Sequence, residues 1–382
     1  MKTVVELLSD LVRIPSHSAV SNRPLVEYAS RILQAADWVT HPLPYTDSAG
    51  VDKVNLIAAP PGQTPETRDV DLVFMCHTDT VPYAADWPNA VDPTLQDGNL
   101  HGCGACDVKA VLACLLALIS AHRSDPWPDG LRLVLTADEE IGCIGASRLF
   151  AAGAIRARRM IIGEPTQLQP ARAGKGYCLA EIKVHGREAH SAHPQQGVSA
   201  IYHAARLISL IEDLAGSPAV PTNSFFEPAI TTINVGTIEG GTAKNIVPGE
   251  CRFMLEWRPI PGDEADRILE SVRQITHRYA AHNPECRVEI QPLREQPGFE
   301  TPADSPLVRA VEALTGTSAT SIPFGSEASI LAPVAGEIVV FGPGDMRTAH
   351  SNRECVAVAD LHTAVACFRA LVNGAAGSGN DR

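Results

Sequence analysis

Two apolar segments of the sequence lead directly into clusters of ionisable residues. Residues 71–75 (DLVFM) are followed by CHTD (76–79), and residues 131–136 (LRLVLT) are followed by ADEE (137–140). Short apolar runs bounded by polar residues are typical of buried strands. Polar side chains just beyond the ends of such strands are typical of α/β enzyme sites. The pattern therefore predicts an α/β protein with a catalytic or metal site at the ends of its strands.

The first part of the chain alternates predicted helices with predicted strands, which indicates a sheet covered by helices. A similar pattern resumes near the C-terminus, with a helix at residues 306–315, a strand at 336–341 and a helix at 356–372. In the first part, the helices are expected at residues 3–13, 24–37, 108–122 and 145–152, and the strands at 54–59, 71–75, 131–136 and 159–162.

Between these two parts the order of predicted elements changes to β-α-β-β-α-β, the order of a ferredoxin-like unit. Its strands are expected at residues 177–185, 230–239, 250–257 and 287–291, and its helices at 198–214 and 263–281. We therefore expect two domains. One is discontinuous and is formed by residues 1–175 and 291–382, and the other, residues 176–290, is inserted into it.

Composition and charge limit the kinds of molecule that the protein is expected to bind and the compartment in which it is expected to be found. The formal net charge is −13 and there is no long basic run, which argues against nucleic acid and against an anionic membrane surface. The ten cysteines are scattered, mostly in apolar runs, as expected for reduced thiols in the cytoplasm rather than for a disulfide framework. The N-terminal residues are typical of an amphipathic helix rather than a signal peptide. No apolar run approaches the length of a membrane span.

The candidate metal ligands form a mixed set of histidine and carboxylate side chains. Such a set suits zinc, and a carboxylate shared between two ions suits a pair of zinc ions. Within the ADEE segment, one glutamate is expected to bind metal and the other to act as a general base. The candidates are spread over most of the chain: His77, Asp79, Asp107, Glu139, Glu140, Glu164 and His350.

Single members of this set also have simpler explanations. His77 and Asp79, two positions apart at a strand end, are equally consistent with a core histidine bonded to a turn aspartate. Asp107 precedes a predicted helix and suits its N-cap without a metal. Glu139 and Glu140 are consistent with a solvated loop pair.

The Cys103-x-x-Cys106 motif leaves two further interpretations open. One is a redox pair of the thioredoxin type, and the other is half of a structural zinc site. A second Cys/His pair at similar spacing is not evident. Two loop thiols without special chemistry are therefore the favoured interpretation.

Taken together, seven motifs resemble those of the metallo-aminoacylase, carboxypeptidase and desuccinylase superfamily, in order and in spacing along nearly the whole chain. The motifs are HTDTVP (77–82), GACDVK (104–109), TADEEIG (136–142), GEPT (163–166), GREAHSAHP (186–194), NIVPGECRF (245–253) and AHSNRE (349–354). The segments GEPTQLQPARAGKG (163–176) and FGSEASI (324–330) point to the deacetylase branch. The resemblance implies an α/β/α zinc-hydrolase domain with a mixed sheet and an inserted α+β lid and dimerisation domain.

The resemblance also assigns roles to the matched positions. Two zinc ions are implied, with cobalt as an alternative metal. His77 and Glu164 would hold one ion, Glu140 and His350 the other, Asp107 would bridge them, Asp79 would orient His77, and Glu139 would be the general base acting on zinc-bound water.

For the inserted domain, the resemblance implies a homodimer in which His190 reaches the active site of the neighbouring subunit and polarises the scissile carbonyl. Asn245 and Arg258 match positions that contact substrate, and arginine suits a bidentate grip on a carboxylate. In the deacetylase interpretation, Gly325 and Ser326 are candidates for the substrate carboxylate and Glu327 for a side-chain ammonium. The simpler alternatives are that His190 is a surface histidine, that Arg258 is a solvated arginine and that Glu327 is an acidic loop residue.

The expected reaction is hydrolysis of a small N-acyl amino acid. The preferred candidate substrate is N2-acetyl-L-ornithine, which is hydrolysed in arginine biosynthesis. N-succinyl-diaminopimelate, other N-acyl amino acids and dipeptides are the alternatives within the superfamily. A metal-binding or amino-acid-binding protein without catalysis is a different class, and the intact Glu139 argues against it. Two departures from the family pattern, Cys103 in place of arginine and Ala110 in place of glycine, leave the ligands untouched and affect the expected loop geometry.

Overall fold

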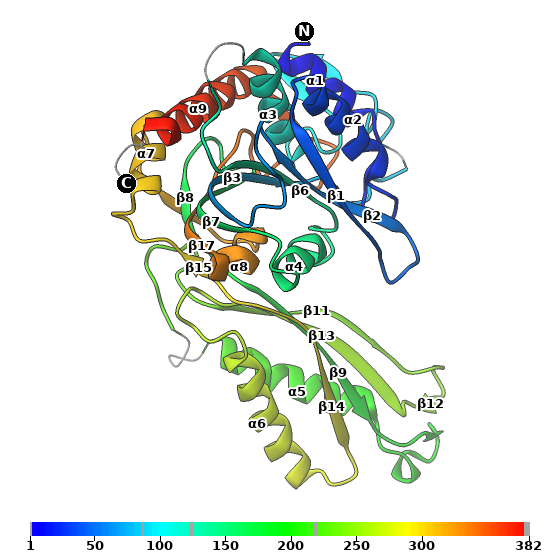
Figure 1. Cartoon of the computed structure of the whole chain (residues 1–382). Coiled ribbons are helices and arrows are strands. Elements are labelled where there is room, and N and C mark those ends of the chain that lie inside the picture. The colour runs from blue at the N-terminus through cyan, green and yellow to red at the C-terminus, as the bar shows by residue number, and fades with distance from the viewer. Residues whose placement is uncertain (1, 86, 123–125, 217–220, 378–382) are drawn as a thin grey trace. The chain divides into compact units, whose positions relative to one another are not determined.

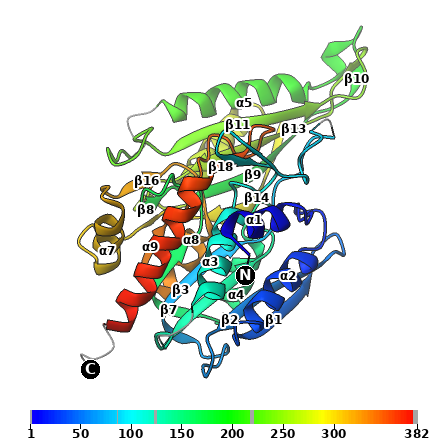
Figure 2. The same cartoon turned by 90° about the horizontal axis from the view of Figure 1, so that it is seen from above.

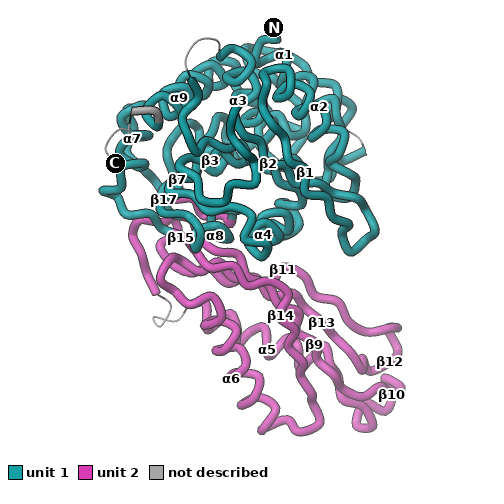
Figure 3. Tube along the Cα trace, viewed as in Figure 1, with its two compact units in different colours: residues 1–173, 300–320, 326–382 teal, residues 174–299, 321–325 magenta. Residues whose placement is uncertain are grey.

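The structure is a computed structural model that describes residues 2–85, 87–122, 126–216 and 221–377. The chain forms two compact units (Figure 3). Unit 1 comprises residues 1–173, 300–320 and 326–382, and unit 2 comprises residues 174–299 and 321–325. The fold class predicted from the sequence, a mixed α/β sheet domain with an inserted α+β domain, is confirmed.

Unit 1 is built on a nine-stranded mixed sheet (Figure 1). The inner strands β6, β3, β7 and β17 are parallel to one another, while β1 is antiparallel to β2, β2 to β6 and β8 to β17. In spatial order the strands are β1 (Val39–Thr46), β2 (Asp52–Ala59), β6 (Leu131–Thr136), β3 (Asp69–His77), β7 (Arg156–Ile162), β17 (Ala335–Val340), β8 (Ala171–Gly174) and β15 (Phe299–Glu300), with β16 (Thr320–Ile322) paired to β8.

Helices cover both faces of this sheet (Figure 1). On one face α3 packs against α1 and α9 (Figure 2), and all of its first eight residues are buried. The burial on both sides of α3 follows from its apolar sequence, KAVLACLLALISA. The helices of that face are α1 (Val4–Val12), α2 (Arg23–Gln34), α3 (Lys109–Ala121), α7 (Pro306–Thr315) and α9 (Val358–Gly377), and those of the other face are α4 (Ile144–Ala151) and α8 (Glu327–Leu331).

Strand β1 is an element that the sequence did not reveal. Its sequence, VTHPLPYT, contains Pro42 and Pro44, which cannot donate backbone hydrogen bonds. In the structure β1 is the edge strand of the sheet and pairs with β2 alone. An edge strand needs hydrogen bonds on one side only, so the prolines are tolerated there.

Unit 2 is a four-stranded antiparallel sheet in the order β11-β13-β9-β14. The predicted β-α-β-β-α-β order is present, and the predicted alternation of β9 is observed as a strict buried/half-buried pattern. The buried face packs against the two helices in one apolar core. The elements are β9 (Tyr177–His185), α5 (Ala200–Ala215), β11 (Thr232–Gly240), β13 (Glu250–Arg258), α6 (Arg267–His282) and β14 (Arg287–Gln296).

Short elements complete the chain. They are the two-stranded sheet of β10 (Ala189–His190) and β12 (Ile246–Val247), the three-stranded sheet of β18 (Cys355–Ala357), β5 (Asn99–His101) and β4 (Thr94–Gln96), and the 3-10 turns η1 (Pro194–Gln196) and η2 (Ala332–Val334).

The largest differences from the expected bounds, five residues each, are at the ends of β14 and α9. Strand β14 continues to Gln296, so the return to unit 1 follows residue 299 rather than residue 290. Helix α9 continues to Gly377, five residues beyond its expected end. Across the described residues, the helices are all too short or too polar to cross a membrane.

Candidate metal centre and substrate-contact residues

Three of the predicted site segments lie at the carboxyl ends of neighbouring parallel strands. His77 is the last residue of β3, Glu139 and Glu140 follow β6, and Glu164 follows β7. Because β6, β3 and β7 are adjacent and parallel, their ends lie along one edge of the sheet. Asp107 enters this edge from the loop before α3.

Asp107 lies between the two histidines of the site. Its Oδ1 is 3.1 Å from His77 Nε2, and its Oδ2 is 3.2 Å from His350 Nε2. Glu140 Oε1 is also 3.2 Å from His350 Nε2. Ligand atoms of His77, Asp107 and Glu140 lie within 4.8 Å of one another, close enough to share a metal ion. Residues distant in sequence thus provide one compact set of donors.

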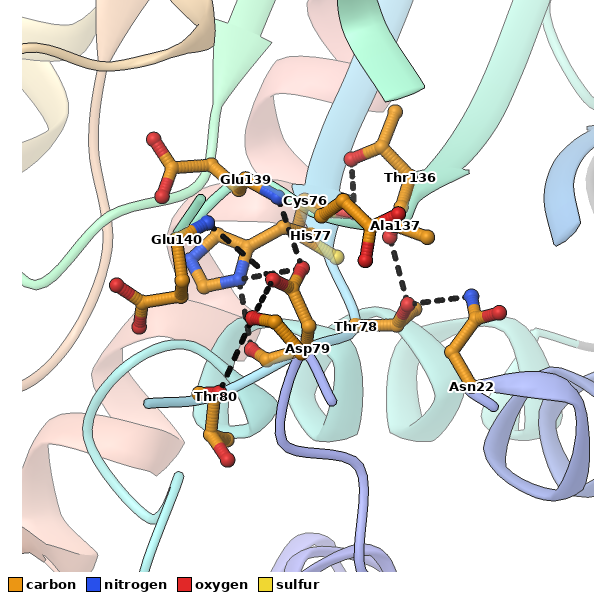
Figure 4. A network of polar contacts seen from close by, with 12 residues as sticks. Asn22, Cys76, His77, Thr78, Asp79, Thr80, Thr136, Ala137, Glu139 and Glu140 are labelled. Atoms are coloured by element: carbon orange, nitrogen blue, oxygen red, sulfur yellow. Dashed lines mark hydrogen bonds and ion pairs between the residues drawn. The ribbon is translucent and has the colours of Figure 1, made fainter. Parts of the chain in front are cut away.

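Asp79 connects the two strand ends. Its carboxylate accepts the backbone N–H groups of Glu139 (3.1 Å) and Glu140 (3.2 Å) and the Ser18 hydroxyl (2.8 Å), as Figure 4 shows in part. His77 Nδ1 lies 2.9 Å from the backbone oxygen of Asp79 and 3.7 Å from its carboxylate. The backbone oxygen of Asp79 accepts the Nδ1 proton, so the neutral ring has an unprotonated Nε2 that can bind a metal, whereas a hydrogen bond from Nε2 to Asp107 requires the protonated ring. The Asp79 carboxylate chiefly holds the turn that carries the two glutamates.

The ionisable groups at this edge of the sheet have shifted pKa values, and carboxylates are in excess among them. Burial raises the pKa of Glu139 to about 7 and also raises the pKa values of Glu140 and Glu164. Burial has the same tendency at Asp107, but the hydrogen bonds with His350 and His77 outweigh it and lower its pKa. The bonds to Asp107 and Glu140 raise the pKa of His350 to about 10. Closely spaced carboxylates that resist ionisation are relieved by a bound cation.

Glu164 is 3% exposed and lies outside the compact group of His77, Asp107 and Glu140. Its pKa is raised first by burial and then by the negative charge of Asp107, and it is lowered by His77. Glu164 is therefore near the ligand set, on the side of the neighbouring strand β7.

In unit 2, His190 and Asn245 are brought together by the pairing of β10 with β12. The N–H of Ser191, next to His190, donates to the backbone oxygen of Asn245 (3.0 Å). Both predicted residues are exposed. His190 Nδ1 accepts the N–H of Ala192 (3.0 Å), so the proton of the neutral ring is on Nε2. The exposed His190 ring thus offers a hydrogen-bond donor.

Arg258 and Gly325 both lie against Tyr177 in unit 2. The Arg258 guanidinium is 4.8 Å from the centre of the Tyr177 ring, and its Nε donates to Glu256 (2.8 Å). A Cβ added at Gly325 would lie 3.0 Å from Tyr177 Cβ, so the position suits a small residue. Tyr177 was not among the predicted residues, and no sequence signal marks it.

Ser326 and Glu327 begin helix α8 in unit 1, and both are buried. Glu327 has no exposed surface, and burial raises its pKa to about 8. In this conformation its carboxyl group is out of reach of a substrate ammonium group. The proposed ammonium contact therefore requires a change of conformation around α8.

Comparison with known proteins places the chain in a family. The model of peptidase family M20/M25/M40 matches residues 73–374. An acetylornithine deacetylase of Myxococcus xanthus is 42% identical over 355 residues, which is 93% of this chain and 92% of that protein. The chain belongs to peptidase family M20/M25/M40. It is accordingly a metal-dependent hydrolase that acts on amide bonds.

Solved structures share the fold of this M20 chain. A tripeptidase of Staphylococcus aureus aligns over 98% of both chains with a TM-score of 0.78 and 24% identity. An M20 family metallo-carboxypeptidase of Sulfolobus solfataricus aligns over 98% of this chain and 100% of its own, with a TM-score of 0.76 and 16% identity.

The M20 centre also contains a buried ion pair that sequence reasoning missed. Lys53 Nζ lies 2.7 Å from Asp138 Oδ1, with both side chains at most 1% exposed. The Tyr45 hydroxyl donates to the other Asp138 oxygen (2.9 Å). Asp138 has a left-handed backbone (φ 59°) and immediately precedes Glu139. The position of Asp138 in the ADEE segment was the available sequence signal for a role in the centre. Its partners could not be predicted, because Lys53 and Tyr45 lie far away in the sequence.

The two cysteines of the Cys103-x-x-Cys106 motif have separate partners. The Cys103 thiol donates to Thr80 Oγ1 (3.6 Å), and the Cys106 thiol to the backbone oxygen of Asp345 (3.5 Å). Burial raises the pKa of Cys103 to about 11 and also raises the pKa of Cys106. Thiols that resist ionisation are poor redox nucleophiles, so the interpretation as loop thiols remains the favoured one.

Proposed function

We propose that this M20 chain hydrolyses N2-acetyl-L-ornithine to L-ornithine and acetate, as a step of arginine biosynthesis. The observation that carries the chemistry is Asp107 placed between His77 and His350, with the Glu139-Glu140 turn held beside them by Asp79. The substrate is supported by the identity with a protein named acetylornithine deacetylase, at 42% over 93% of the chain.

The cofactor in this proposal is a pair of zinc ions, with cobalt as an alternative metal. The donor set of imidazoles and buried carboxylates suits zinc, and the excess of carboxylates is consistent with bound cations. Bound zinc would polarise the acyl carbonyl and make water more acidic. In this proposal His77 and Glu164 would hold one ion, Glu140 and His350 would hold the other, and Asp107 would be a ligand to both.

Glu139 is proposed as the general base. Its carboxylate takes a proton from the attacking water and passes it to the leaving amine nitrogen. A pKa that burial raises to about 7 in the metal-free protein suits a group that both accepts and releases a proton near neutral pH. Asp79 holds the Glu139 backbone, and the Cys143 thiol donates to Glu139 Oε1 (3.3 Å), so the base is held at both ends.

Substrate recognition is assigned to residues of both units. His190 donates a hydrogen bond from Nε2 to the acyl oxygen, in the active site of the neighbouring subunit of a homodimer. Arg258, with Asn245, binds the substrate carboxylate and exchanges its contact with Glu256 for the ligand. Gly325 and Ser326 are proposed as further carboxylate contacts, and Glu327 as an ammonium contact once it is exposed.

Unit 2 is proposed as the lid and dimerisation domain, and unit 1 as the catalytic domain, with the cytoplasm as the location. All ten cysteines are outside disulfides and nine are buried, as expected for a protein of a reducing compartment. Size-exclusion chromatography with light scattering tests the dimer, and a monomer at micromolar concentration would contradict it.

The test of the function is hydrolysis by purified protein, stripped of metal and then reloaded with zinc. The substrates are N2-acetyl-L-ornithine, N-succinyl-diaminopimelate, a panel of N-acyl amino acids and dipeptides. We expect zinc-dependent turnover with the highest kcat/KM for acetylornithine. Zinc-dependent preference for another substrate would reject the substrate and retain the chemistry, and zinc binding without any turnover would reject both.

A further inference from the structure

Glu354, at the end of the AHSNRE motif, has no role in the proposed reaction, yet it is 2% exposed. It lies four residues after His350 and immediately before β18. A buried carboxylate is costly unless hydrogen bonds or an ion pair satisfy it. The groups that hydrogen-bond to the Glu354 carboxylate therefore indicate which part of the structure it holds in place.

The Glu354 carboxylate accepts three backbone N–H groups from the loop that carries Asp107. Oε2 accepts the N–H of Gly104 (3.1 Å), and Oε1 accepts those of Cys106 (3.0 Å) and Asp107 itself (3.0 Å). The backbone oxygen of Glu354 also accepts the N–H of Gly102 (3.2 Å). One residue thus satisfies four amides of a six-residue segment, and its carboxylate fills a concave group of amides of the kind that binds anions.

The loop itself has little freedom to adopt another shape. Gly104 has a φ of +79°, and a Cβ at this position would lie 2.8 Å from both Lys109 Cδ and Thr80 Cγ2. The Lys109 ammonium group is fixed in turn by the backbone oxygen of Ile14 (2.9 Å). The position of Asp107 therefore depends on contacts that all converge on residues 104–109.

We propose that Glu354 is a positioning residue of the metal centre. Because His350 and Glu354 lie on one segment, the bonds from Glu354 to the Asp107 loop fix the bridging carboxylate relative to a histidine ligand. The result is the 3.2 Å approach of Asp107 Oδ2 to His350 Nε2. This inference rests on the proposed function for the roles of Asp107 and His350 as ligands.

Glu354→Gln is the sharpest variant because it keeps size and shape. A glutamine side chain has one acceptor oxygen and one NH₂ group. Depending on its orientation, it keeps either the two hydrogen bonds made by Oε1 or the single bond made by Oε2. In both cases its NH₂ group faces a backbone N–H group to which it cannot bond. We expect the variant to fold and its zinc affinity to fall by about 10–100-fold, the loss typical when a residue that orients a ligand is removed. We also expect kcat to fall with KM nearly unchanged.

The matched control is Asp345→Asn. Asp345 lies on the same segment, five residues before His350, and its carboxylate accepts the Arg347 N–H (2.9 Å) and the Gln167 side-chain amide (2.9 Å). The Asp345 side chain is 27% exposed, and these two partners lie outside residues 102–107. Its backbone oxygen accepts the Cys106 thiol (3.5 Å), a bond that the substitution leaves in place. We expect wild-type zinc affinity for this variant.

Two measurements without substrate separate positioning from general stability. The first is zinc affinity by competition with a chelator. The second is hydrogen exchange of the Gly104, Cys106 and Asp107 amides in the metal-free protein, which should quicken in Glu354→Gln and not in Asp345→Asn. Faster exchange at these amides with unchanged zinc affinity would overturn the proposal, because Glu354 would then serve the fold alone.

If Glu354→Gln fails to fold, Glu354→Asp takes its place. Aspartate keeps the charge but is one methylene shorter and cannot reach both groups of amides, so we expect a smaller loss of zinc affinity in the same direction. Wild-type zinc affinity in that variant would overturn the proposal. Because zinc affinity and exchange need no substrate, a wild-type protein that binds zinc but does not hydrolyse acetylornithine would defeat the proposed function and leave this test intact.

Discussion

The candidate site residues of the two units differ in how firmly the protein holds them. In unit 1, His77 is 1% and Asp107 5% exposed, and His350, although its side chain is 49% exposed, is paired with both Asp107 and Glu140 from distant segments. In unit 2, His190 and Asn245 are exposed, and the Arg258 side chain is 31% exposed. Buried charged groups need partners from several segments of the chain. Exposed polar groups instead form hydrogen bonds with water, and a bound ligand displaces that water. We infer that the candidate metal centre of unit 1 is arranged before substrate binds, and that the proposed substrate contacts of unit 2 form only when substrate is present.

The largest effect should come from Glu139→Gln, which removes the proposed base from the prearranged unit. We expect kcat to fall about 10³-fold, within the range for loss of a general base, while zinc content stays at the wild-type level. Metal analysis and steady-state kinetics measure both. Glu140→Gln is the control, since it should lose zinc as well as turnover. Near-normal turnover of Glu139→Gln would show that the base is a different group.

Asp107→Asn tests the prearrangement itself. The amide keeps the shape but removes the charge between His77 and His350, so we expect zinc affinity to fall about 100-fold, the upper part of the range for groups that orient ligands. Chelator competition measures the affinity. Asp97→Asn, in the exposed turn between β4 and β5, should bind zinc as the wild type does. Equal affinities for the two variants would refute a shared Asp107 ligand.

His190→Asn tests an exposed group of unit 2. We expect kcat to fall about 100-fold, as when a donor to a developing oxyanion is lost, with zinc affinity unchanged because His190 is not a proposed ligand. The nearby His193→Asn serves as the control and should retain activity. A His190 variant with lowered zinc affinity would contradict the separation between the two units.

Arg258→Lys keeps the charge and removes the planar fork that suits a carboxylate. We expect KM to rise about tenfold and kcat to change little, because the loss of one bidentate contact weakens binding more than chemistry. Arg252→Lys, on the same strand β13 and paired with Glu239, is the control. If KM rises equally in both variants, Arg258 has no special role in binding.

The smallest effect concerns stability. Burial raises the pKa of Glu327 from 4.5 to about 8, so the folded protein holds this proton more tightly than the unfolded chain does. The resulting stabilisation is fully present below pH 4.5 and is lost as the pH rises toward 8. Metal-stripped Glu327→Gln should therefore melt about 3–6 °C above the wild type at pH 8, with a smaller difference at pH 5. The exposed Glu27→Gln controls for charge, and identical pH profiles for Glu327→Gln and wild type would refute the assignment.

The sequence by itself determined the order of the major elements and the residue types of the centre. Apolar runs such as LRLVLT and the alternation in β9 are local signals, because burial on one or both faces is written in neighbouring residues. The clusters at the ends of these runs pointed to His77, Glu139 and Glu140 for the same reason.

Only the tertiary structure decided which groups meet. The Asp107 carboxylate lies between histidines from two other segments, Asp79 binds the turn after a neighbouring strand, and Glu354 binds a loop some 250 residues away. Strand β1, with its two prolines, became visible only as the edge of the sheet. The physical reason is common to all of these. A side chain's chemistry belongs to its own residue, but its hydrogen-bond partners depend on where distant loops return.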